Sequence, residues 1–237
     1  MMDFLLSPVA VTSVLGVAGL GFVMGLRHAL DADHVAAVSA IVSRGGGWLK
    51  ATRIGVFWGL GHSATLLGVG FGLVFLKLTV PAGAALIFET VVGLMLIVLG
   101  LRAWRQARRG GVHIHTHAHD GSAHVHLHAH ADSPSHNHAH VPFLVGMLHG
   151  LAGSAALAVL VMAASSSVAG SLSYMLAFAV GTMVGMSVTS AVLGAPLAWA
   201  ARFPRWRTNV ARGAGAVSVL VGTLIIWEMG SKLAYGG

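Results

Sequence analysis

The chain has 237 residues, of which 56% are hydrophobic and only 9% are charged. A soluble domain carries about 25% charged residues, so this composition argues against one small soluble domain. It favours a chain embedded in a bilayer. The chain has no cysteine, which excludes disulfides, thiolate metal sites and dithiol redox chemistry. The net charge of +7 does not indicate nucleic-acid binding, because Lys and Arg lie in short segments between apolar stretches.

Apolar stretches of membrane-spanning length recur along the chain. They cover residues 4–20, 22–43, 54–77, 84–105, 142–164, 171–196 and 209–229. We therefore predict an all-α fold, a polytopic membrane helix bundle with six or seven transmembrane helices. The first two stretches meet at Gly19–Gly21, so they form either a tight hairpin or one broken helix. The N-terminus lacks the basic start of a signal peptide, and we expect no cleavage there.

The basic residues predict the orientation of these helices. Three connecting segments, 44–53, 105–141 and 197–208, contain Arg or Lys, whereas 78–83 and 165–170 contain neither. Segments rich in Arg and Lys stay in the cytoplasm. We therefore expect these three segments in the cytoplasm and the C-terminus outside.

Two short motifs occur twice, which indicates an internal repeat. Gly25-Leu26-Arg27-His28 is echoed by Gly146-Met147-Leu148-His149, and Gly61-His62-Ser63 by Gly185-Met186-Ser187. The predicted organisation is a helix at 1–20, a three-span repeat at 21–105, a loop at 106–141 and a second three-span repeat at 142–237. The loop charges make the repeats inverted, as in many transporters with a site near the membrane midplane. Chance similarity between Gly/Ala-rich helices is the alternative.

The strongest indication of function is a polar run inside a predicted membrane helix. His28, Asp31, Asp33 and His34 fall within seven residues. A carboxylate at membrane depth costs at least about 2.5–3.5 kcal/mol and usually marks a functional site. On a regular helix these side chains spread over an arc, so one cation needs local unwinding or another helix to complete its ligands. Imidazole with carboxylate suits divalent nickel, cobalt, zinc or iron. A structural pair such as Arg27–Asp31 is the alternative.

Other polar residues in the spans are weaker candidates. His62 and His149 are either metal ligands or satisfied core residues, and the repeat relates His149 to His28. Glu89 either balances Arg27, moves protons or forms a buried structural pair. Ser63, Thr65 and Ser154 are more consistent with hydrogen bonds between helices than with metal ligation.

The loop after the third span of the first repeat is exceptionally rich in histidine. Alternating histidines in a segment with few apolar residues predict a disordered, metal-collecting loop on the cytoplasmic side. A pH-responsive linker is the alternative. The predicted accessory capture residues are His113, His115, His117, His119, His124, His126, His128, His130, His136, His138 and His140.

The run from Arg27 to Val35, Arg-His-Ala-Leu-Asp-Ala-Asp-His-Val, resembles the signature helix of the nickel/cobalt transporter superfamily. Leu60-Gly61-His62-Ser63 is similar to the second motif of that superfamily. The resemblance implies that His28, Asp33 and His34 recognise the metal, with Asp31 beside them and His62 from the next helix. Larger importers have a third motif with Asp and Glu, whereas the stretch from Gly146 to Ser154 has neither. The chain looks more like the compact urease-accessory-type members.

These observations lead to a prediction of function. We expect a permease, not an enzyme, that carries Ni²⁺ or Co²⁺ as its substrate and holds no permanent cofactor. Uptake for metalloenzyme maturation is the first expectation, and efflux for metal resistance is the alternative direction. A membrane metalloenzyme or a metal sensor is the alternative class. The expected partners are the divalent ion, the bilayer and a cytoplasmic metallochaperone, with no nucleic acid; the oligomeric state stays open.

Overall fold

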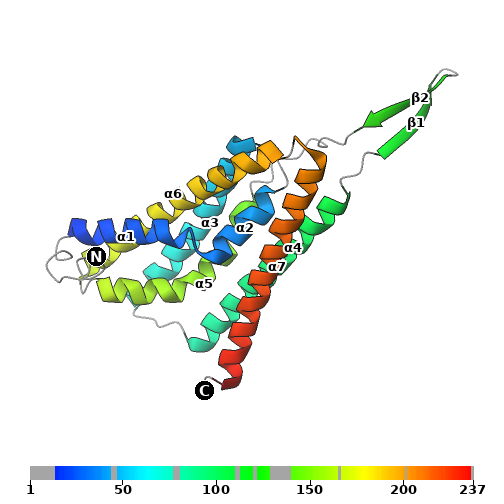
Figure 1. Cartoon of the computed structure of the whole chain (residues 1–237). Helices are drawn as coiled ribbons and strands as arrows, with labels where there is room; N and C mark the ends of the chain where they lie inside the picture. The colour runs from blue at the N-terminus through cyan, green and yellow to red at the C-terminus, as the bar shows by residue number, and fades with distance from the viewer. Residues whose placement is uncertain are drawn as a thin grey trace.

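The computed structural model of the chain describes residues 14–43, 47–76, 81–109, 113–119, 122–128, 140–164, 167–200 and 202–235. The described residues form helices and one small antiparallel sheet (Figure 1). In chain order the elements are α1 (Val14–His28), α2 (Ala32–Val42), α3 (Gly47–Leu76), α4 (Ala82–Arg109), β1 (His113–His119), β2 (Ser122–His128), α5 (His140–Ala164), α6 (Val168–Ala200) and α7 (Pro204–Tyr235).

The length and apolar character of the helices confirm a polytopic membrane protein. Among the described residues, four stretches could each cross a bilayer: Gly47–Gly72, Gly83–Ala107, Val168–Leu197 and Arg205–Tyr235. Helices α1 and α2 together form a fifth candidate, bent by 54° at their junction. Helix α5 adds a shorter apolar stretch, His140–Gly153. Six or seven crossings and the domain division stay predictions.

The first helix break lies later in the chain than the sequence predicted. Helix α1 continues through Gly19–Gly21 to His28, and the chain bends at residues 29–31 before α2 begins. The predicted break at Gly19–Gly21 was wrong, because Gly21 allows α1 to pack closely on α6 rather than to bend. A Cβ at this position would lie 2.5 Å from the Tyr174 carbonyl oxygen of α6. Glycine there allows the two backbones to approach closely.

The predicted basic loop at 44–53 is also shorter than expected. Helix α3 begins at Gly47, so Lys50 and Arg53 lie in its first turns. Gly47 has a φ of 76°, a left-handed conformation that glycine adopts without steric cost. The turn into α3 is therefore complete by residue 47, seven residues before the apolar stretch predicted at 54.

The helices pack mainly across the two halves of the chain. Helix α3 packs on α5 and α6, α1 packs on α6, and α4 lies along α7, with α2 contacting α7 and α4 (Figure 1). One buried core includes Trp58, Leu96 and Met186, and a second includes Leu66 and Tyr174. The Ser63 hydroxyl donates a hydrogen bond of 3.0 Å to the Ala179 carbonyl, as expected for a serine that joins two helices.

Within the histidine-rich loop the structure has two strands, at 113–119 and 122–128, while the disorder expected of this loop stays a prediction. Strands β1 and β2 pair antiparallel, with His113 opposite His128, His115 opposite His126 and His117 opposite His124. The alternation of histidine with other residues has a period of two, which is itself a strand pattern. This hairpin is the exception to the predicted all-helical fold, and it projects beyond the helices in Figure 1.

Candidate metal centre

The bend between α1 and α2 brings the polar run together. His28 is the last residue of α1, and Asp31 precedes α2 with an extended backbone at φ −60° and ψ 149°. The Leu30 and Asp31 amides donate hydrogen bonds to carbonyls in the last turn of α1, which closes that helix. His34 then lies in the first turn of α2, and its ring centroid is 4.5 Å from that of His28. The local unwinding that one cation would need is present.

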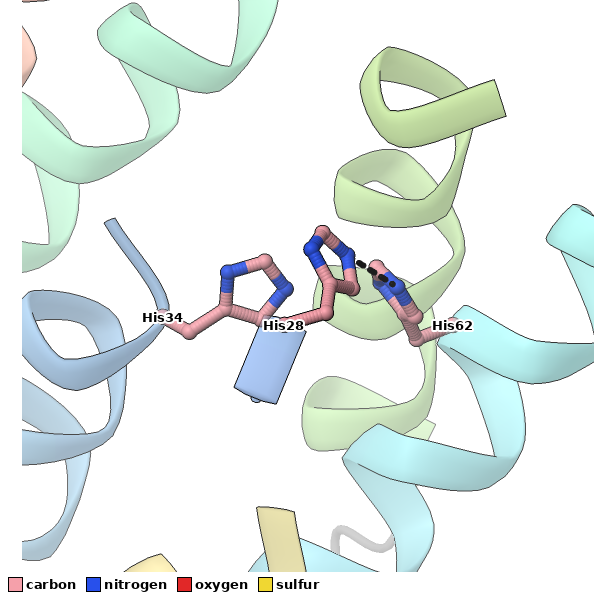
Figure 2. A group of neighbouring side chains, drawn as sticks. All are labelled: His28, His34 and His62. Carbon is pink, nitrogen blue, oxygen red and sulfur yellow. Dashed lines mark hydrogen bonds between the residues drawn. The ribbon is translucent and has the colours of Figure 1, made fainter. Parts of the chain in front are cut away.

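Two further helices contribute histidines to the same place. His62 of α3 is 0% exposed and His149 of α5 is 1% exposed. The His28 Nε2 atom lies 3.3 Å from the His62 Nε2 atom, and the centroids of the three rings drawn in Figure 2 are 4.5 to 5.3 Å apart. The His149 ring stacks on the His34 ring with centroids 4.1 Å apart. Four imidazoles from four different helices therefore form one cluster.

Two carboxylates fix the orientation of three of these rings. Asp31 Oδ2 lies 2.8 Å from His28 Nδ1. Asp33 uses both oxygens: Oδ1 lies 2.9 Å from His34 Nδ1, and Oδ2 lies 2.7 Å from His149 Nε2. When each ring nitrogen donates its hydrogen to the carboxylate, the second nitrogen of the ring keeps its lone pair. Carboxylate–histidine pairs of this kind orient metal ligands in many proteins.

The donor atoms fall into two groups that could each hold a metal ion. His28, His34 and His62 form the first group, and Asp33, His34 and His149 form the second. Within each group the donor atoms lie within 4.8 Å of one another. His34 Nε2, His62 Nδ1 and His149 Nδ1 are buried without a hydrogen-bond partner. Buried polar atoms are usually paired, so the unpaired His34 Nε2 is consistent with a place for a divalent late transition metal.

Two aromatic residues that sequence reasoning missed surround the cluster. The Trp58 ring centroid lies 5.5 Å from that of His34 and 5.7 Å from that of His149. Phe178 lies 5.4 Å from His28. Trp58 is one helical turn before His62 on α3, a spacing that could have identified it. These rings place an apolar wall against the imidazoles.

The other predicted residues lie at the edge of the centre or away from it. Asp31 contacts His28, and its side chain is 52% exposed. Glu89 of α4 is half-buried. Of the loop histidines, His130, His136 and His138 lie outside the described residues, and His140 is the exposed first residue of α5. His113, His115, His117, His119, His124, His126 and His128 lie in the hairpin.

Comparison with known proteins identifies a family and several relatives of this chain. Residues 47–224 match the family described as the cytochrome C biogenesis protein transmembrane region. The chain is 33% identical over 221 residues to the urease accessory protein UreH of Bacillus sp. (strain TB-90), covering 92% of this chain and 93% of that protein.

Two metal transporters are similar over shorter stretches. The high-affinity nickel transport protein of Cupriavidus necator is 27% identical over 119 residues, which cover 43% of this chain and 34% of that protein. The cobalt transport protein NhlF of Rhodococcus rhodochrous is 33% identical over 88 residues, which cover 35% of this chain and 22% of that protein. No solved structure matches the chain. The chain belongs to the family of the cytochrome C biogenesis protein transmembrane region and to the nickel/cobalt permease superfamily, among its short urease-accessory-type members.

Proposed function

We propose that this chain is a permease that carries Ni²⁺ or Co²⁺ across the bacterial inner membrane, with uptake for metalloenzyme maturation as its direction. The observation that carries the proposal is the convergence of four histidines and Asp33 at a broken helix within the apolar part of the chain. The printed names of two relatives, a nickel and a cobalt transport protein, support this substrate class. The relatives compared above are named as transporters or as an accessory protein, which favours transport over catalysis.

The proposed ligands suit the proposed ion. His28, Asp33 and His34 are the central residues, with His62, His149 and Asp31 around them. Neutral imidazoles bind divalent late transition metals well, whereas soft monovalent copper prefers sulfur. The Asp33 carboxylate offsets part of the ionic charge in a poorly solvated place, where an unpaired charge is costly.

We propose that the membrane part consists of two inverted repeats, α1–α4 and α5–α7. The contacts between α4 and α7 support this relationship. Gly93 lies against Gly222, and Gly100 lies against Gly215. Gly215 follows Gly93 by the same number of residues as Gly222 follows Gly100. If the two halves are equivalent, Gly93 corresponds to Gly215 and Gly100 corresponds to Gly222. The contact between Gly93 and Gly222 then corresponds to the contact between Gly215 and Gly100.

The contacts around the histidines support the same exchange. His28 lies against Phe178 at 5.4 Å, and His149 lies against Trp58 at 5.7 Å. A Cβ at Gly25 would meet the backbone of Phe178 and Thr182, and one at Gly146 would meet that of Trp58 and His62. In the repeat that we propose, Thr182 therefore occupies the position that corresponds to His62. The motif comparison in the sequence had instead aligned His62 with Met186, one helical turn later.

This arrangement suggests how transport would proceed. The two halves would move relative to one another and expose the centre alternately to the two sides of the membrane. The chain has no nucleotide-binding loop, so we propose coupling to an ion gradient. The histidine hairpin would collect ions at the cytoplasmic side, where a metallochaperone would be the partner.

Radioactive nickel accumulation in cells tests the proposal. Cells that express the wild-type chain are compared with His28→Ala, Asp33→Ala and the control Glu228→Ala, at equal expression. Uptake predicts accumulation above that of empty cells for the wild type and Glu228→Ala, and none for the other two variants. Accumulation below the empty-cell level, restored by His28→Ala and Asp33→Ala, would reverse the direction to efflux. Equal levels in all cells would contradict transport.

A further inference from the structure

We propose that the centre holds its ion in two alternative positions that share His34. The first position is formed by His28, His34 and His62, and the second by Asp33, His34 and His149. The inference rests on the proposed transport function and deepens it, because it assigns His149 and Asp33 as direct ligands at one stage of transport. The ion would pass from one position to the other without leaving the His34 ring.

The geometry of the donor atoms carries the two positions. Each group of three donors lies within 4.8 Å, which is close enough for one ion to contact all three after a small contraction. The groups have only His34 in common. Three donors in each position leave room for water or another ligand, as an ion in transit requires.

The two edges of the His34 ring distinguish the positions. Its Nδ1 atom faces Asp33 Oδ1 at 2.9 Å, and its Nε2 atom is buried and unpaired. An ion in the first position would bind Nε2 while Nδ1–H stays on Asp33. An ion in the second position would bind Nδ1 between Asp33 and His149. A neutral imidazole has one lone pair for a metal, so the positions are occupied in turn.

The stacking of His149 on His34 completes the second position. The ring centroids lie 4.1 Å apart with an angle of 26° between the planes. The same carboxylate contacts both rings, since Asp33 Oδ2 lies 2.7 Å from His149 Nε2. An ion that replaces the hydrogen atoms between these nitrogens and the carboxylate would meet three donors at once. Each ring stays neutral, because its hydrogen moves to the other ring nitrogen, which is Nε2 in His34 and Nδ1 in His149. Both of these nitrogens are buried without a hydrogen-bond partner.

The two positions also differ in the helices that form them. The first uses α1, α2 and α3, all of which precede the hairpin. The second uses α2 and α5, so it joins the two halves of the chain. A movement of α5 relative to α3 would alter the second position more than the first. Transfer of the ion across His34 would thus be linked to the relative movement of the halves.

Equilibrium binding of Ni²⁺ to the purified full-length chain tests the proposal. The histidines between 113 and 138 are first replaced by Ser, so that binding reports the membrane centre alone. His62→Gln removes the first position, His149→Gln removes the second, and His34→Gln removes both. Glu228→Gln, which removes an exposed carboxylate paired with Lys232, is the control. Melting temperature in detergent checks that each variant is folded.

The two positions predict a distinct pattern of affinities. Each of His62→Gln and His149→Gln should still bind one Ni²⁺, weakened by no more than about 10-fold, whereas His34→Gln and the double variant should lose more than about 100-fold. Both single variants should lose most transport, because the ion cannot be passed on. One shared site is indicated instead, and the proposal overturned, if His62→Gln or His149→Gln alone abolishes binding as fully as His34→Gln.

His149→Asn separates ligation from orientation. An asparagine amide can donate a hydrogen bond to Asp33, but it is a poor ligand for nickel. Loss of transport in this folded variant supports a second metal position, whereas wild-type transport would show that His149 only orients Asp33 and would overturn it. If the chain with the serine-substituted loop binds no Ni²⁺ at all, the proposed function itself fails and the second position falls with it.

Discussion

His28 and His62 present their Nε2 atoms to each other at 3.3 Å, although they belong to different helices 34 residues apart. Two neutral imidazoles can share one hydrogen at this distance, and a metal ion can replace that hydrogen by inserting between them. The contact exists because α1 ends at His28, which leaves this side chain free to turn towards α3. The helix break therefore creates the pair.

Asp31 is predicted to strengthen metal binding without touching the ion. Its carboxylate accepts a hydrogen bond from His28 Nδ1 at 2.8 Å, which makes Nε2 a better donor. Asp31→Asn should weaken Ni²⁺ binding by about 10- to 100-fold, as for other residues that orient a metal-bound histidine. Titration of the purified chain with Ni²⁺ measures this change. Glu228→Gln, which removes a carboxylate paired with Lys232, is the control and should bind like the wild type.

Gly25 is predicted to be essential for the packing of α1 on α6. A Cβ at this position would clash with the Phe178 carbonyl, whereas one at Gly19 of the same helix would meet nothing within 4 Å. Gly25→Ala should destabilise the chain by about 1–3 kcal/mol, a typical cost of overpacking, and Gly19→Ala should not. Thermal unfolding in detergent compares the two. Equal melting temperatures would show that the contact between α1 and α6 is looser than described.

The histidine hairpin is predicted to assist transport without being required for it. Substitution of its histidines by Ser leaves the donors of the centre in place, because those lie in α1, α2, α3 and α5. Nickel accumulation should persist at high external Ni²⁺ and fall at low Ni²⁺, where collection of ions matters. Transport assays over a range of concentrations provide the measurement. Complete loss at every concentration would instead favour a sensor that depends on the loop.

The orientation of the chain can be measured directly, because it has no cysteine of its own. Ser167 lies between α5 and α6, and Arg202 lies between α6 and α7; both are exposed. The positive-inside rule predicts that Ser167→Cys reacts with a membrane-impermeant maleimide in intact cells, whereas Arg202→Cys reacts only after lysis. The reverse pattern would invert the predicted topology and place the hairpin outside.

The sequence predicted the helical membrane fold, and it pointed to residues that the structure brings together, but it did not predict their geometry. Apolar length was sufficient for the helices, because a bilayer requires continuous apolar stretches. The position of the first break was missed, since glycine in α1 permits either bending or close packing, and only the facing backbone of α6 decides between them. Trp58 was also missed, although its position one helical turn before His62 on α3 could have identified it.

The pairing of the helices has a consequence for how the chain assembles. Helices α1, α3 and α4 each pack mainly on helices in the other half of the chain. Helix α1 packs on α6, α3 packs on α5 and α6, and α4 packs on α7. The first half can insert into the bilayer as it is synthesised, but its helices have little to pack against until the ribosome has delivered α5 to α7. The two halves therefore form one folding unit. The packing of α1, α3 and α4, and with it the joining of His149 to the other histidines, must wait until their partners in the second half have been synthesised.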